Sequence, residues 1–253
     1  MIGLSIFNRR TFGEDVSQTL CSYYFDGSSH HIDFGDILES VLTGSNPVFS
    51  IRAVVRRLAT GVSHSFLGKW NSSGNNRQII ARIHSNDKLQ FATSGNGSNT
   101  KISSSTETFT DTSGWYDIII TFDGTQAIGS KIKAYSNNSA LTISDVAEDI
   151  YSGGSEGLEV GTLIPGSGVW NGYINQVQIT SDIITPSEVE SLYNNGSYRL
   201  GADILDNLEL DCIFDNDTFG GTNWTVIDDS GNGNNGTSGS MDAVDRDCNE
   251  NPY

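Results

Sequence analysis

The sequence contains little charge, little proline and few cysteines. Charged residues make up 18% and hydrophobic residues 36% of the 253 positions, and there are only 4 prolines beside 28 glycines. Most other positions are Ser, Thr and Asn, which are typical of turns and of neutral polar strand faces. Because apolar runs are short and alternate with polar residues, this composition predicts hairpins rather than disorder.

Basic residues are scarce as well. Lys and Arg number 14 against 31 Asp and Glu, which gives a net charge of −17. Such a negative field repels nucleic acids and anionic membranes, so neither is expected as a partner. No run approaches the ~20 apolar residues of a membrane span. The N-terminal MIGLSIFNRR places its arginines after a short apolar run, the reverse of a secretory signal, so we expect a mature form or release by another route, such as phage lysis.

Three cysteines, Cys21, Cys212 and Cys248, are an odd number for a disulfide framework. Nothing else in the sequence indicates an oxidising environment, so buried free thiols are expected. The alternative is a Cys212–Cys248 bridge that would tie down the C-terminal tail.

Three runs alternate between apolar and polar residues with the period of a half-buried strand. Their apolar rows are Phe49, Ile51, Ala53 and Val55; Ile79, Ala81 and Ile83; and Tyr116, Ile118, Ile120 and Phe122. The opposite rows carry Arg52 and Arg56; Arg82; and Trp115, Asp117 and Thr121. Strands at this spacing, separated by Gly- and Asn-rich turns, predict two antiparallel sheets packed face to face.

A strand, a turn and a capped helix follow one another in Gly172–Gly196. In the strand, Ile174, Gln176 and Gln178 alternate with Tyr173, Val177 and Ile179. Thr185 is suited to cap the helix, Pro186 to its first position, and Glu188 to closing a capping box. This pattern predicts one short helix near residues 186–194.

The same segment resembles the closing part of laminin-G-like domains (laminin G type 3) of the concanavalin A-like lectin/glucanase kind, in which a G-x-I-x-x-V-x-I strand leads into a TPSEV helix. Further similar stretches follow in the family's order: Phe25-Asp26-Gly27, Phe49-Ser50-Ile51, Leu89-Gln90-Phe91 and Trp115 to Thr125. The resemblance implies an all-β antiparallel sandwich, a jelly roll with one short helix. We expect residues 19–253 to form a single sandwich that includes a C-terminal extension, preceded by residues 1–18 as an arm or lead-in strand.

Catalysis by a glucanase of this fold requires carboxylates in the pattern E-x-D-x-x-E or E-x-D-x-E, because one acid donates a proton while another attacks the sugar. The nearest stretch begins with Glu209 and Asp211, but Ile213 or Phe214 stands where the third acid belongs. We therefore predict that the protein is not an enzyme.

Glycan binding on this fold uses exposed aromatic rings beside amides and carboxylates. Two clusters fit this description: Trp70 with Asn71, Asn75 and Asn76, and Trp170 with Tyr173. We expect Trp70 to be exposed, since it ends a strand before a polar loop. Trp115 and Trp170 occupy strand positions of the family and are expected to be structural.

Calcium is the one cofactor that the sequence suggests, because acidic loops supply the oxygen ligands it requires. Asp228, Ser230 and Asn232 match the first half of a calcium loop, D-x-[DNS]-x-[DN]-G, and laminin-G-like relatives bind calcium at a sandwich rim. The bidentate acid expected later in the loop is absent, since that position is Gly239. The alternative interpretation is an ordinary Asn-Gly turn.

The resemblance also implies a role, because stand-alone domains of this kind occur in phage proteins: we expect a non-enzymatic structural or adhesive protein of a virus particle, such as a capsid decoration, fibre or tail component of a tailed phage. Its partners would be other virion proteins, further copies of itself and surface glycans. Ile2, Leu4, Ile6 and Phe7 make the arm a candidate attachment segment. The alternative is an extracellular carbohydrate-binding or adhesion module of a cellular organism.

Overall fold

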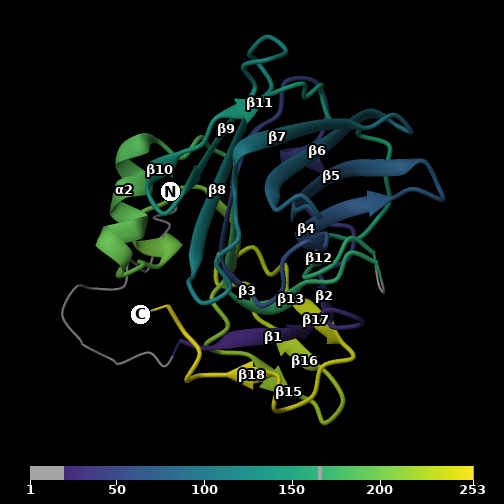
Figure 1. Ribbon diagram of the computed structural model, residues 1–253. Helices are drawn as coiled ribbons and strands as arrows, with labels where there is room; N and C mark the ends of the chain where they lie inside the picture. Colours follow the sequence, from purple (N-terminus) through teal and green to yellow (C-terminus); the bar gives the residue numbers. More distant parts are fainter. Residues whose placement is uncertain (1–19, 165–166, 253) are drawn as a thin grey trace, which may run out of the picture.

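The computed structural model describes residues 20–164 and 167–252, and these form two antiparallel sheets packed face to face (Figure 1). The predicted all-β sandwich of the concanavalin A-like kind is confirmed. The arm predicted at residues 1–18 lies outside the described residues.

The first sheet has eight strands and carries the site described below. Its order is β10 (Ser139–Ala140), β9 (Ile132–Ser136), β8 (Tyr116–Asp123), β3 (Val48–Arg57), β13 (Asn171–Thr180), β1 (Ser22–Asp26) and β18 (Arg246–Asp247), with β14 (Leu208–Cys212) also paired to β13. The second sheet has ten strands. Its order is β11 (Ile143–Ser144), β7 (Lys101–Thr108), β6 (Lys88–Gly97), β5 (Asn76–Ile83), β4 (His64–Asn71), β12 (Glu159–Val160), β2 (His31–Asp33), β17 (Gly236–Gly239), β16 (Trp224–Val226) and β15 (Thr218–Phe219).

The core lies between the two sheets and is built from the apolar rows found in the sequence. All three predicted rows belong to one buried cluster, and only Tyr116 among them is partly exposed. Large aromatic rings fill the space between the sheets, and Phe49 stacks on Phe122 at a centroid distance of 5.2 Å. Because side chains alternate along a strand, the polar rows of β3 and β8 fall on the outer face of the first sheet.

A β-bulge in β13 changes the predicted alternation. The register with β3 shifts between Ile174 and Gln176, so one extra residue, Asn175, lies opposite β3. Ile174 therefore shares the core face with Val177 and Ile179, and its predicted place beside the glutamines is wrong. A strict period of two cannot anticipate an inserted residue.

The predicted helix is present as α2 (Pro186–Tyr193), which packs outside the first sheet (Figure 1). Thr185 and Glu188 form the predicted capping box. Val189 and Leu192 bury the helix against Ile119 of the sheet. The 3-10 turns η1 (Asn194–Gly196) and η2 (Gly201–Asp203) follow, and a four-residue helix, α1 (Glu39–Leu42), lies between β2 and β3.

The C-terminal strands are divided between the two sheets at one end of the sandwich, where β18 pairs with β1 and β17 with β2 (Figure 1). A disulfide joins Cys21, directly before β1, to Cys248, directly after β18. The expectation of free thiols is therefore wrong for these two residues, and so is the alternative Cys212–Cys248 bridge. Cys212 is unpaired and buried in the core.

Among residues 20–164 and 167–252, no helix has the length and apolar character needed to cross a membrane.

Candidate functional site

Trp70 is buried, with only 6% of its surface exposed, so its predicted exposure is wrong. It packs against Ile80 and Ala92 of neighbouring strands, and Leu163 covers this small cluster. The guanidinium of Arg77 lies 6.0 Å from the centre of its ring. A tryptophan at a strand end is exposed only when no loop folds over it, and here the 161–164 segment does so.

The other residues predicted to bind glycans lie apart. Asn71, Asn75 and Asn76 belong to the hairpin between β4 and β5, in the ten-stranded sheet. Trp170 is fully buried and packs edge-on against Phe66, as expected for a structural residue. Only Tyr173 combines an aromatic ring with partial exposure, and it lies on the eight-stranded sheet. The predicted residues therefore do not converge on one site.

Tyr173 belongs instead to a row of large side chains that crosses the outer face of the eight-stranded sheet. We call this row the aromatic strip, and its members are Tyr24 on β1, Tyr173 on β13, Arg56 on β3, and Trp115 just before β8. Tyr24 is directly opposite Tyr173, and Tyr173 is directly opposite Arg56. Since Val55 pairs with Tyr116, antiparallel register brings Arg56 beside Trp115.

The members of the strip contact one another and remain partly exposed, and these include Trp115, which the sequence had led us to expect in a structural role. The ring of Tyr173 lies 5.4 Å from that of Tyr24 and 6.4 Å from that of Trp115, measured between centroids. The guanidinium of Arg56 lies 5.5 Å above the ring of Tyr173, within cation–π range. The planes of Tyr24 and Trp115 are inclined to that of Tyr173 by 50° and 51°, so the rings form a stepped aromatic surface against which apolar groups can pack.

A hydrogen-bonded support holds Trp115 in the strip. The Trp115 carbonyl accepts hydrogen bonds from Nδ2 of Asn137 (3.2 Å) and from the hydroxyl of Tyr198 (3.1 Å). Two residues further on, Asp117 forms a buried bidentate ion pair with Arg52, with both N–O distances 2.9 Å. These contacts fix the backbone that carries Trp115.

Carboxylates border the Arg56 end of the strip. Glu250 of the C-terminal tail forms an ion pair with Arg56. Burial raises the pKa of Tyr173, and the negative charges of Glu250 and Asp247 raise it further. Hydrogen bonds from Ser113, aided by the charge of Arg56, lower the pKa of Asp111. Glu250 and Asp111 therefore supply hydrogen-bond acceptors at this end of the strip.

The Tyr24 end carries a histidine between two further carboxylates. The His30 ring lies 6.1 Å from the Tyr24 ring, and its Nε2 is 3.8 Å from both Asp26 and Asp245. Burial alone would raise the pKa of Asp26, but hydrogen bonds from Ser28, Ser29 and the backbone of His30 hold it well below its usual range. Asp26 is thus ionised at any ordinary pH.

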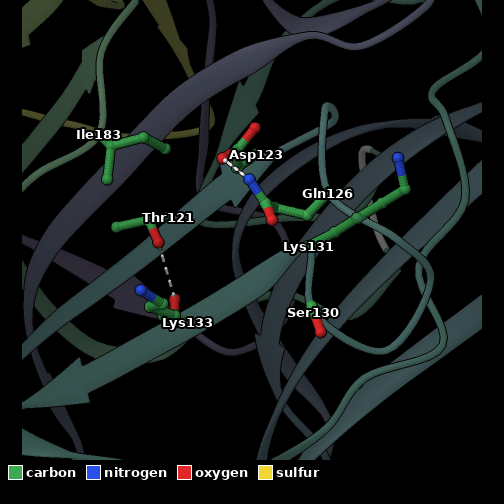
Figure 2. A pocket seen from close by; sticks show the side chains of 7 residues that line it. All are labelled: Thr121, Asp123, Gln126, Ser130, Lys131, Lys133 and Ile183. Carbon is green, nitrogen blue, oxygen red and sulfur yellow. Dashed lines mark hydrogen bonds between the residues drawn. The ribbon is translucent and has the colours of Figure 1, made fainter.

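A polar pocket of about 260 Å³ lies at the other end of β8, roughly 20 Å along the strand from Trp115 (Figure 2). Figure 2 shows Gln126 turned toward Asp123, which accepts a 2.8 Å hydrogen bond from it. The ammonium group of Lys131 donates hydrogen bonds to the carboxylate of Asp149 and to the carbonyl of Gly124. Three of the polar residues that line the pocket, Asp123, Gln126 and Lys131, therefore already have hydrogen-bond partners within the protein.

The predicted calcium ligands fold into a hydrogen-bonded turn. The Asp228 carboxylate accepts the backbone N–H groups of Asp211, Ser230 and Asn234. The Nδ2 of Asn232 donates to the carbonyl of Leu208. In the described part of the chain, no group of three or more His, Cys, Asp or Glu is arranged to hold a metal ion. This geometry does not fit a calcium site as it stands, and calcium binding stays a prediction.

Two pairs of acids resemble, in their chemistry, the pair that a glycosidase uses. Asp211 is buried, which raises its pKa to about 6, and Glu209 lies on the same strand. Glu159 is directly opposite Asp33, and burial together with the charges of Asp33 and Glu156 raises its pKa to about 8. Glu159 is largely buried, however, with 8% of its surface exposed, and its Oε2 has no hydrogen-bond partner among the residues that the structure describes.

Comparisons with known proteins agree with the fold. A family model of the concanavalin A-like lectin/glucanases superfamily matches residues 26–190. No curated protein matches the sequence. A candidate carbohydrate-binding protein from Bacteroides ovatus is similar in structure, with a TM-score of 0.58 and 18% identity over 87% of this chain and 58% of its own.

Two further solved structures share the fold. A heptameric SAP-like pentraxin from Limulus polyphemus has a TM-score of 0.50 and 14% identity over 69% of this chain and 82% of its own. The CBM40 module of a Ruminococcus gnavus sialidase, bound to α2,3-sialyllactose, has a TM-score of 0.50 and 12% identity over 70% of this chain and 99% of its own.

Proposed function

The chain belongs to the concanavalin A-like lectin/glucanase superfamily, and we propose that it is a non-catalytic carbohydrate-binding module whose glycan stacks on the aromatic strip. The observation that carries the proposal is the row of partly exposed rings on neighbouring strands, Tyr24, Tyr173 and Trp115. Sugar rings present flat patches of C–H groups, which match aromatic faces, while their hydroxyls require polar partners at the rim.

The surroundings of the strip supply polar partners for the hydroxyls of a sugar. Carboxylates of Glu250 and Asp111 lie at one end, and those of Asp26 and Asp245 at the other, where β18 with Asp247 pairs with β1. Carboxylates accept hydrogen bonds from hydroxyl groups, and two at different positions fix the orientation of a sugar. The sugar-bound CBM40 module of R. gnavus supports glycan binding as a use of this fold, and the strip supplies the residues in this chain.

We propose that the protein is not catalytic because its candidate acidic residues do not match the arrangement that a glucanase requires. Glu209 and Asp211 lack the third acid of the glucanase pattern, and the raised pKa of Glu159 belongs to a largely buried carboxyl. Disulfides persist in oxidising surroundings, so the Cys21–Cys248 bridge supports a location outside the cell.

Replacing Tyr173 by Ala is expected to weaken glycan binding at least about tenfold, because a central aromatic contact is worth about 1.4 kcal/mol or more. A glycan array identifies the ligand, and calorimetry measures the affinity of the wild type and the variant. Tyr151→Ala is the matched control, since Tyr151 is a partly exposed tyrosine whose backbone N–H donates to Ser94 of β6, in the other sheet. Equal affinities of the wild type and Tyr173→Ala would refute the proposal.

The narrower prediction, a structural or adhesive role in a virus particle, rests on the sequence argument, and an exterior glycan-binding module is compatible with it. If residues 1–18 are the attachment segment, their deletion should give a folded protein that is missing from purified particles. Particles that still contain the truncated protein, or a truncated protein that is unfolded, would contradict the attachment role.

A further inference from the structure

Arg56 is the permanently charged cation of the aromatic strip, and its charge is already neutralised. Glu250 forms an ion pair with its Nη1, and the side chains are 22% and 35% exposed, respectively. An anionic group of a ligand could bind the guanidinium only by displacing the Glu250 carboxylate.

The backbone holds Glu250 in place. It follows Cys248 by two residues, and Cys248 is joined by the disulfide to Cys21 at the start of β1. Just before the disulfide, β18 pairs with β1 through Ser22 and Tyr23. The carboxylate is therefore tethered beside the strip rather than carried on a free tail.

Further carboxylates lie near the strip. The carboxylates of Glu250 and Asp247 are close enough to raise the pKa of Tyr173, an effect that follows burial in size. Asp111 lies within electrostatic range of Arg56. The whole chain adds a net charge of −17. Like charges brought together at an interface oppose binding, whereas neutral hydroxyls donate hydrogen bonds to the same carboxylates.

We propose that the aromatic strip selects neutral glycans over acidic ones, and that Glu250 enforces this selection by occupying the guanidinium of Arg56. The inference rests on the proposed glycan-binding function. Glu250 is then a specificity-determining residue, since it accepts hydrogen bonds from a neutral sugar and excludes a sugar carboxylate from the one cationic position of the strip.

The test compares pairs of glycans that differ only in a terminal sialic acid, such as lactose and sialyllactose, at low ionic strength. The wild type is expected to bind the neutral member at least about tenfold more tightly. Glu250→Gln is expected to strengthen binding of the sialylated member about fivefold or more and to change the neutral member by less than about twofold. Glu148→Gln is the matched control. This substitution also removes one negative charge and one ion pair, but the partner of Glu148 is Lys101 of β7, in the other sheet.

Each outcome is decisive. Equal or tighter binding of the sialylated members by the wild type overturns the inference and leaves the glycan-binding function standing. Equal gains in Glu250→Gln and Glu148→Gln would assign the selection to overall charge and overturn the role of Glu250. If the wild type binds no glycan on the array, the proposed function fails first.

Discussion

Replacing Asp117 by Ala should lower the free energy of unfolding by about 3–5 kcal/mol. Asp117 and Arg52 are 2% and 0% exposed, and they pair through two hydrogen bonds of 2.9 Å. Arg52 also donates to Gln176 and to the carbonyl of Arg199. Without the Asp117 carboxylate, the buried guanidinium keeps its charge but loses its bidentate partner, and this causes the loss of stability.

Denaturant unfolding of the wild type and the Asp117→Ala variant measures this loss. Glu148→Gln serves as the control, because the Lys101–Glu148 pair is about 40% exposed on each side and should contribute less than about 1 kcal/mol. A loss for Asp117→Ala no greater than that of the control would show that the buried pair does not stabilise the first sheet. Because Asp117 also adjoins the backbone of Trp115, weaker glycan binding is expected to accompany the loss of stability.

Replacing Cys248 by Ser should lower the free energy of unfolding by about 2–5 kcal/mol. The disulfide closes a loop of 227 residues, and long loops lose the most chain entropy when they are cross-linked in the unfolded state. A reducing agent should lower the melting temperature of the wild type and leave that of Cys248→Ser unchanged.

Cys212→Ala is the matched control for the disulfide, because it removes a cysteine that forms no cross-link. Its cost, the small cavity left by one buried sulfur atom, should be the same with and without reducing agent. A wild-type melting temperature that is unaffected by full reduction of Cys21 and Cys248 would contradict the account of the tethered tail.

Local patterns in the sequence determine much of the fold. Period-two alternation placed Arg56 and Trp115 on the polar sides of their strands, and the capping box located α2. These signals lie within one element, where side-chain direction follows directly from backbone geometry. The bulge at Asn175 could not be predicted from the sequence. The extra residue arises from the pairing of β13 with β3, and it leaves no local sequence signal.

The aromatic strip could not be assembled from the sequence, because its members are far apart in the chain. Tyr24 and Trp115 share a site only because β1, β13, β3 and β8 are neighbours in the sheet. The disulfide could not be predicted for the same reason, because Cys21 and Cys248 are brought together only by the pairing of β1 with β18. The prediction that Trp70 is exposed was wrong for a different reason. Its strand could be recognised from the sequence, but the loop that covers the side chain could not.

The central claim is that a glycan stacks on the aromatic strip, and tryptophan fluorescence tests it most directly. Trp70, Trp170 and Trp224 are all at most 8% exposed, whereas Trp115 is partly exposed in the strip. Titration with the neutral glycan that binds best on the array should give a saturable fluorescence change in the wild type. The change should vanish in Trp115→Phe and shift to at least about tenfold higher concentration in Tyr173→Ala. A change of the same size in Trp115→Phe, or an unaltered midpoint in Tyr173→Ala, would contradict the claim.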